Sequence, residues 1–370
     1  MAEAARERAI VEFLAKAGWS DAVRRPLAGD ASFRRYERLE LASNGESAQA
    51  VLMDAPPPQE DVRPFIAVAD LIRRAGLSAP EIFAADPKAG LLLIEDFGDD
   101  TYTRLLARGA DERPLYDLAV DVLIELHRNL SQEQIAGLPA FDDARCVEEA
   151  MRLIEWLWPT VHGTAPTATI RRSFESAWRQ VLPAARRIPD GLMHYDYHVD
   201  NLMLLPGPRG PAQVGLLDFQ DAMRAPVSFD LASLLQDVRR DVSQDLAAHC
   251  IARYLAAFPD LDRDAFAASY AVLGAQRNTR ILGTFVRLWV RDGKPGYLNW
   301  LPRTWAMVSR NLDHPALGPV RSWFDRHLPP NLRTIPGSLR AIAEQADAHR
   351  DAAQGSAPSN RKQKDEVEIA

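Results

Sequence analysis

One polar stretch in the second half of the chain constrains the fold most, because it sets three functional side chains around two short apolar segments. Asp196 and Asn201 stand five positions apart, and the apolar segment 202–205 follows directly. A turn rich in Pro and Gly leads to the apolar segment 214–217, which ends at Asp218. Two strands joined by a turn fold back on each other, so we expect Asp218 to return to the neighbourhood of Asn201 and Asp196. Carboxylate and amide oxygens gathered in this way suit Mg²⁺ and a hydroxyl nucleophile.

The spacing within this stretch is typical of phosphoryl transfer. It runs His-x-Asp-x-x-x-x-Asn from His194 and is followed by Asp-Phe, as in protein-kinase-like folds. Phosphoryl transfer depends mainly on positioning and on neutralising charge, so one oriented carboxylate is enough. We therefore predict that Asp196 is catalytic and binds the acceptor hydroxyl, whose proton it takes. Asn201 and Asp218 are predicted to hold Mg²⁺ that bridges the phosphates of ATP. Any one of these residues alone would be a surface or capping group, and only their joint spacing favours catalysis.

The two histidines of the stretch allow another interpretation. On a strand, His194, Asp196 and His198 would point to one face and favour a metal-dependent hydrolase. No other cluster of His or Cys supplies further ligands, and the downstream Asp-Phe would go unexplained. We therefore predict that His194 is a buried residue that braces the loop. His198 is predicted to lie beside the active site, in contact with the substrate.

Composition narrows the class of protein. The chain has 370 residues, 47% of them hydrophobic and 26% charged, which is ordinary for a globular protein of one or two domains. A net charge of −7 argues against binding to nucleic acid. Cys146 and Cys250 follow no metal or disulfide spacing, which suits a reducing compartment. Without a long apolar run or a signal peptide, we expect a cytoplasmic monomer that has no contact with membranes.

The first quarter of the chain predicts strands around one helix. Five strand-like segments and a helix from about 60 to 75 follow in the order β-β-β-α-β-β, after an amphipathic helix at residues 3–17. This order indicates a small antiparallel sheet with a single helix against it, in an α+β fold. We place this first, ATP-binding lobe at residues 1–97.

The turn between the first two predicted strands consists of small residues, 28–32. A hairpin with such a tip can fold its backbone N–H groups over phosphates, because no bulky side chain blocks the approach. We therefore predict that Gly29, Asp30 and Ser32 bind the nucleotide. Taken by itself, the segment is better explained as an ordinary hairpin, and only its position ahead of the polar stretch favours phosphate binding.

From residue 98 the periodicity is helical. We predict a mostly helical lobe at 98–350, with helices at 101–108, 112–130, 146–158, 167–185, 230–238, 241–257, 263–290 and 302–327. Residues 351–370 have low hydrophobicity and are predicted to be a disordered tail. Asp230 stands at a helix N-terminus, where it could cap the helix or reach the backbone of the polar stretch. We predict the second, structural role.

Taken together, these residues resemble the aminoglycoside phosphotransferase-like, choline-kinase-like small-molecule kinases over nearly the whole chain before the tail. Four segments are similar in particular to the bacterial anomeric kinases of N-acetylmuramate and N-acetylglucosamine, which serve peptidoglycan recycling: 51–57, 94–99, 217–222 and 290–294. The resemblance implies a two-lobed, protein-kinase-like fold and ATP-dependent phosphorylation of the C1 hydroxyl of the sugar. It also implies that the hinge backbone from Glu95 to Phe97 holds adenine.

One departure from the family concerns the nucleotide phosphates. Kinases of this fold usually carry a Lys on the third strand and a Glu in the following helix, whereas here the strand offers Met53 and the helix has no Glu in its middle. Both residues of the expected Lys–Glu ion pair are absent together, so neither charge is left buried and unpaired. We predict that Arg34 or Arg35 supplies the missing cation. The missing Lys also leaves open an ATP-binding scaffold without catalysis.

The charge of residues 231–300 indicates which kind of acceptor molecule the protein binds. Residues 231–300 contain nine Lys or Arg against seven Asp and no Glu. Arg277, Arg280, Arg287 and Arg291 recur at helical spacing and would form a basic stripe, although most such stripes are solvated faces. A basic lobe suits an acidic sugar such as N-acetylmuramate better than a polycationic antibiotic. We predict that Arg291 discriminates between the two sugars, while an aminoglycoside, choline or homoserine remains an alternative acceptor.

Overall fold

The computed structural model describes residues 2–27, 33–43, 46–207 and 209–333, and within them the chain forms two compact units. Among the described residues, unit 1 contains those up to Leu130 and Val199–Ala222, and unit 2 contains Ser131–His198 and those from Met223 to Arg333. The boundary between His198 and Val199 divides the polar stretch, with Asp196 in unit 2 and Asn201 in unit 1. The lobe boundary at residues 97 and 98 and the disordered tail stay predictions, the tail lying outside the described residues.

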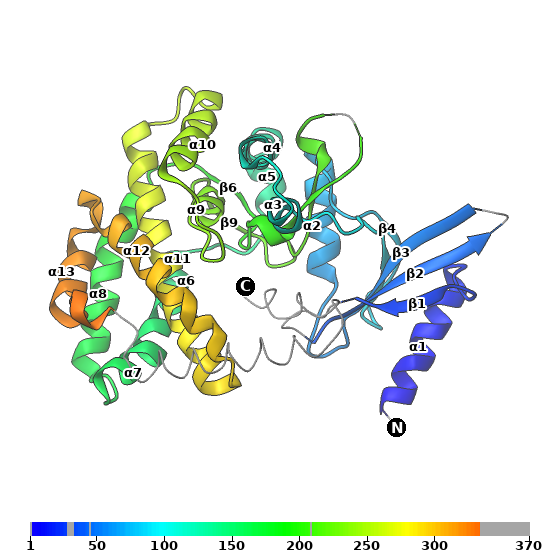
Figure 1. Cartoon of the computed structure of the whole chain (residues 1–370), viewed down its shortest axis with the longest axis horizontal. Coiled ribbons are helices and arrows are strands. Elements are labelled where there is room, and N and C mark those ends of the chain that lie inside the picture. Colours follow the sequence, from blue (N-terminus) through cyan, green and yellow to red (C-terminus); the bar gives the residue numbers. More distant parts are fainter. Residues whose placement is uncertain (1, 28–32, 44–45, 208, 334–370) are drawn as a thin grey trace. The chain divides into compact units, whose positions relative to one another are not determined.

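Unit 1 is built on an antiparallel sheet of five strands, which confirms the predicted sheet (Figure 1). The strand order is β1-β2-β3-β5-β4, and every adjacent pair is antiparallel. The strands are β1 (Val23–Pro26), β2 (Arg35–Ser43), β3 (Glu46–Asp54), β4 (Ile82–Asp86) and β5 (Leu91–Ile94).

Two helices accompany this sheet, and both lie where the sequence predicts a helix, although only the second was expected to pack against the sheet. Helix α1 (Ala2–Lys16) packs Ile10, Phe13 and Leu14 into one apolar cluster with side chains from β2, β3 and β5. Its Arg6 pairs with the buried carboxylate of Asp54 at the end of β3. Helix α2 (Arg63–Arg74) buries an amphipathic face of four residues: Phe65, Val68, Ala69 and Ile72.

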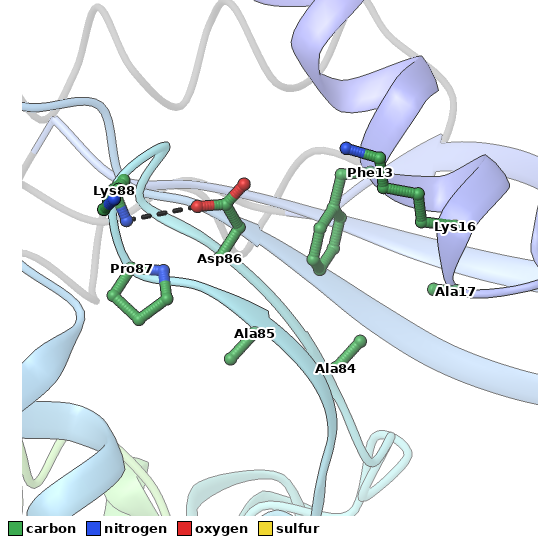
Figure 2. Close-up of a pocket in the computed structure, with 8 residues that line it drawn as sticks. All are labelled: Phe13, Lys16, Ala17, Ala84, Ala85, Asp86, Pro87 and Lys88. Carbon is green, nitrogen blue, oxygen red and sulfur yellow. Dashed lines mark hydrogen bonds between the residues drawn. The ribbon is translucent and has the colours of Figure 1, made fainter.

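A pocket of about 330 Å³ lies between α1 and β4 (Figure 2). Its acidic group, Asp86, accepts hydrogen bonds from the backbone N–H groups of Lys88 and Ala89, at 3.2 and 3.0 Å. Because the carboxylate closes the turn after β4, it contributes to the turn rather than to a ligand site.

The remaining elements of unit 1 support the polar stretch. Strands β7 (Leu202–Leu204) and β8 (Val214–Leu216) form the predicted hairpin, which lies beside α3 (Tyr102–Ala107) and α4 (Glu112–Asn129). The N–H of Leu216 donates to Ser78 O at 2.8 Å. A Cβ at Gly215 would lie 2.6 Å from the Phe97 ring, so only glycine lets that ring pack on β8.

Among its described residues, unit 2 is helical apart from one strand pair, β6 (Asp190–Met193) with β9 (Met223–Pro226). The 30-residue helix α11 (Arg263–Asp292), yellow in Figure 1, contacts four other helices of the unit and is buried over most of its length. These are α6 (Asp143–Arg152), α8 (Ala168–Ala185), α9 (Phe229–Leu235) and α12 (Leu301–Leu312). The other helices are α5 (Gln132–Ile135), α7 (Trp158–His162), α10 (Gln244–Ala257) and α13 (Gly318–His327).

Two predicted helices are interrupted in the structure. The segment 302–327 forms α12 and α13, because Pro315 lacks an N–H and His314 before it is extended. The segment 146–158 contains a π-helical turn, Leu153–Leu157, between α6 and α7. Among the described helices, none is long and apolar enough to cross a membrane.

Candidate active site

In unit 1, the β7–β8 hairpin brings Asn201 and Asp218 to the same end. Leu202 pairs with Leu216, and the N–H of Leu217 donates to Asn201 O at 3.0 Å. Asp218 follows one residue later, with a φ of 58°. This left-handed conformation is uncommon for a residue other than glycine and occurs preferentially at functional sites. The sequence prediction that these two residues return to one place therefore agrees with the hairpin register.

Two side chains hold the carboxylate of Asp218, and the residue after it anchors the backbone. Its carboxylate accepts a hydrogen bond from Gln220 Nε2 at 2.7 Å and lies 3.6 Å from Arg34 Nη2. The next residue, Phe219, is fully buried and packs on the ring of Phe65 from α2, with the centroids 4.7 Å apart. Within the Asp-Phe pair, the buried aromatic ring anchors the backbone that carries the partly exposed carboxylate.

The structure distinguishes between the two arginines proposed for the phosphates. Arg34 is 8% exposed and lies between two carboxylates, those of Asp218 and, at 3.8 Å, Glu60. Arg35 is exposed. Glu60 also accepts the N–H of Phe33 at 3.1 Å, and it was missed by the sequence analysis because it precedes α2. The sequence feature that could have drawn attention to Glu60 is its position shortly after a run of three prolines.

The hinge segment is braced by ion pairs. Asp96 accepts hydrogen bonds from Arg38 at 2.5 and 3.0 Å, and its side chain is 4% exposed. The N–H of Glu95 donates to Glu81 O at 2.8 Å, and the Glu95 carboxylate accepts the Glu81 N–H at 3.1 Å. Adenine binding here stays a prediction. Three further predicted nucleotide contacts, Gly29, Asp30 and Ser32, lie outside the described residues.

In unit 2, the loop that carries Asp196 is held through its backbone. Asp230, at the start of α9, accepts the N–H of His194 at 2.5 Å and that of Tyr195 at 3.1 Å. This is the contact predicted for Asp230. Burial raises the pKa of this carboxyl group to about 7, while the two N–H donors act in the opposite direction. Tyr195 has a φ of 81°, so it too is left-handed.

Tyr195 is fixed by further contacts that the sequence did not reveal. Its hydroxyl donates to Glu149 Oε1 at 2.9 Å, and the guanidinium of Arg280 lies 4.5 Å from its ring centroid. Glu149 is 6% exposed, although it is charged. The signal was present in the sequence, because Glu149 stands on the apolar face of its helix, between Cys146 and Leu153.

The histidines of the loop are buried with Asp196. His194 is fully buried, and its ring meets that of Tyr197 edge-on, with the centroids 5.5 Å apart. Asp196 and His198 are each 3% exposed. Burial, followed by nearby cations, lowers the pKa of His198 well below 6.5, so it is neutral at pH 7. Within the described ranges, no group of three or more His, Cys, Asp or Glu is arranged to hold a metal ion.

The basic stripe on α11 is divided between the interior and the surface. Arg277 and Arg280 are 3% and 2% exposed, and Arg287 is partly buried. Arg291 is exposed and donates to the neighbouring Asp292 at 2.6 Å. The predicted role of Arg291 in acceptor binding is not tested by this placement.

The comparison with known sequences agrees with the site. Residues 23–267 match the model of the phosphotransferase enzyme family. An N-acetylmuramate/N-acetylglucosamine kinase of Caulobacter vibrioides is 39% identical over 361 residues, which cover 89% of this chain and 98% of that protein. A protein of the same name from Pseudomonas aeruginosa is 36% identical over 75% of this chain and 80% of its own length.

Solved structures agree on the fold. A choline/ethanolamine kinase family protein from Mesorhizobium loti superposes with a TM-score of 0.57 at 14% identity, covering 87% of this chain and 99% of that one. The GDP complex of aminoglycoside 2'-phosphotransferase-IIIa gives 0.54 at 13% identity, with 82% and 97% covered. Because the family model spans the Asp196 loop and the β7–β8 hairpin, and a kinase 39% identical is matched over most of both chains, this chain belongs to the phosphotransferase enzyme family and is a small-molecule kinase.

Proposed function

We propose that this protein is an ATP-dependent sugar kinase that phosphorylates the C1 hydroxyl of N-acetylmuramate and N-acetylglucosamine. Support comes from relatives of that name, one of which is matched over 98% of its length. The reaction would serve peptidoglycan recycling in the cytoplasm, with the protein acting as a monomer.

Asp196 is the proposed proton acceptor for the sugar hydroxyl. An anomeric hydroxyl is more acidic than an ordinary alcohol, so a carboxylate removes its proton more readily. Asp230 fixes the loop backbone at the two residues just before Asp196, which restricts the directions in which the Asp196 side chain can point. Neutral His198 beside it would contact the sugar without adding charge.

The nucleotide side of the proposal uses residues of unit 1. Asn201 and Asp218 supply oxygen ligands from the same end of one hairpin, which fits Mg²⁺ with the remaining positions left to phosphates and water. When bound, Mg²⁺ would neutralise charge on the phosphates. Arg34 would contact the phosphates as the replacement for the missing Lys, and Glu60 would orient it. The hinge backbone from Glu95 to Phe97 and the turn with Gly29, Asp30 and Ser32 complete the proposed ATP site.

One observation carries the catalytic part of the proposal. Within the described residues, Tyr195 and Asp218 are the two non-glycine residues with positive φ, and they adjoin or coincide with the predicted catalytic and metal-binding carboxylates. Such conformations cost on the order of 1–3 kcal/mol each and persist where the surroundings enforce them. A scaffold that only bound nucleotide would have no need of strain beside Asp196.

The test is ADP release measured with a panel of acceptors: both amino sugars, an aminoglycoside, choline and homoserine. Turnover with the two amino sugars is expected, together with ³¹P NMR signals of a sugar 1-phosphate. The Asp196→Asn variant is the control and should release acceptor-dependent ADP about 10²- to 10⁴-fold more slowly. Turnover confined to another member of the panel, or phosphate at another hydroxyl, would refute the proposal.

A further inference from the structure

The two buried arginines of α11 differ in their partners. Arg280 Nη1 lies 3.6 Å from the Glu149 carboxylate, so its charge is balanced locally. Arg277 Nη1 instead donates to two neutral oxygens, Gln236 O at 3.3 Å and Asn278 Oδ1 at 3.5 Å. Its Nε is buried and has no hydrogen-bond partner in the part of the chain that the structure describes. A buried guanidinium with a spare donor and only neutral partners is suited to receive an anion.

The charges around Arg277 leave its own charge incompletely balanced. Burial, followed by the nearby cations Arg280 and Arg239, lowers the pKa of Arg277 to about 10, while Asp237 and Asp196 act in the opposite direction. The group is therefore positively charged at pH 7, although its surroundings disfavour that charge. An anionic ligand would relieve this cost. The influence of Asp196 also places Arg277 within electrostatic range of the proposed catalytic residue.

We propose that Arg277 binds the carboxylate of the acceptor, and so selects N-acetylmuramate over N-acetylglucosamine, which lacks that group. The inference rests on the proposed function and assigns the carboxylate to Arg277 rather than to Arg291. A purely structural role, in which Arg277 only braces Gln236 at the end of α9, would affect both sugars equally. The ratio between the two sugars therefore separates the two roles.

The first experiment compares kcat/KM for both sugars in Arg277→Gln and Arg277→Lys. The Gln variant should lower the value for N-acetylmuramate about 10- to 100-fold more than that for N-acetylglucosamine. The Lys variant keeps the positive charge, so its change should have the same sign but be smaller. Some loss remains because an ammonium cannot form the two parallel bonds of a guanidinium. Arg321→Gln is the matched control, since Arg321 is half-exposed on α13 and pairs with Asp313. An unchanged ratio in the Arg277 variants would overturn the inference.

A second experiment keeps the wild-type protein and changes the ligand. The methyl ester of N-acetylmuramate removes the charge, so wild-type protein should bind the acid at least about tenfold more tightly than the ester. In Arg277→Lys this preference should shrink, and a preserved preference would contradict the inference. If Arg277→Gln does not fold, as judged by circular dichroism, the Lys variant and the ester decide the question.

Binding by calorimetry, with a non-hydrolysable ATP analogue present, separates this inference from the proposed function. If wild-type protein phosphorylates neither sugar, the proposed function fails, and the preference for acid over ester still supports or overturns the role of Arg277. If both sugars are phosphorylated and the Arg277 variants lose both activities alike, the proposed function stands and the inference fails.

Discussion

The charged groups around the two halves of the polar stretch differ in their exposure to solvent and in their partners. In unit 1, Asp218 is 23% exposed at its side chain and sits between an amide and the guanidinium of Arg34. In unit 2, Asp196, His198 and Arg277 are each 3% exposed, and the charge there is governed by burial. Opposite charges with access to water suit a site that exchanges a nucleotide and a metal ion, whereas buried charges suit fixed geometry. Variants in the two halves should therefore fail in different ways.

The largest contrast is expected between Asp196→Asn and Asp218→Asn. The first should lower kcat by about 10²- to 10⁴-fold with the affinity for ATP unchanged, because the amide cannot take a proton. The second should also weaken Mg²⁺-dependent ATP binding, because it removes a metal ligand. Steady-state kinetics and calorimetric titration with ATP measure the two effects. Equal loss of ATP affinity in both variants would remove the distinction between the halves.

The next effect concerns Arg34. Its replacement by Ala should raise the KM for ATP about 10- to 100-fold, because a buried charge-assisted contact to phosphate is lost. The matched Arg35→Ala variant should stay near wild type, since Arg35 is exposed. Initial rates over a range of ATP concentrations measure both. Similar values of KM for the two variants would show that the ion pair with Asp218 has no part in nucleotide binding.

A smaller effect follows from Asp230. Its pKa is raised to about 7 by burial, above the unfolded value of 3.8. The stability that it contributes is therefore fully present below pH 3.8 and is lost as the pH rises through about 7. Between pH 5 and 6, the difference in unfolding free energy between wild type and Asp230→Asn should fall by about 1.4 kcal/mol. Urea unfolding at several pH values measures it, and a difference that does not change with pH would contradict the assigned pKa.

The smallest expected effect is that of Tyr195→Phe. The variant keeps the ring under Arg280 but loses the hydroxyl, which donates to Glu149 and accepts from Arg280, at a cost of about 1 kcal/mol for each bond. Because Arg280 still pairs with Glu149, the loop should keep its conformation and kcat should change little. Thermal unfolding and kinetics test this. A large fall in kcat would show that the hydroxyl itself positions Asp196.

The features of the candidate site that sequence reasoning predicted and the structure contains are the local ones. The β7–β8 hairpin and the role of Asp230 followed from apolar runs, a turn and a helix start, and these depend on neighbours within a few residues. The sequence could not choose between Arg34 and Arg35, because the choice depends on which strand face meets Glu60 and Asp218, residues distant in the chain. It also did not identify Glu149 as a buried residue, because a carboxylate is normally expected at the surface even when it stands on the apolar face of a helix.

The amino-acid sequence by itself determined which residue types stand at Asp196, Asn201 and Asp218, and that a hairpin joins the last two, because spacing and turn chemistry act locally. Only the tertiary structure decided the environments of the arginines on α11. That helix is covered by neighbours along most of its length, so its periodicity does not show which face is solvated. Packing against α6 and α9 buries Arg277 and Arg280 and leaves Arg291 outside, and burial rather than spacing sets how strongly each charge acts.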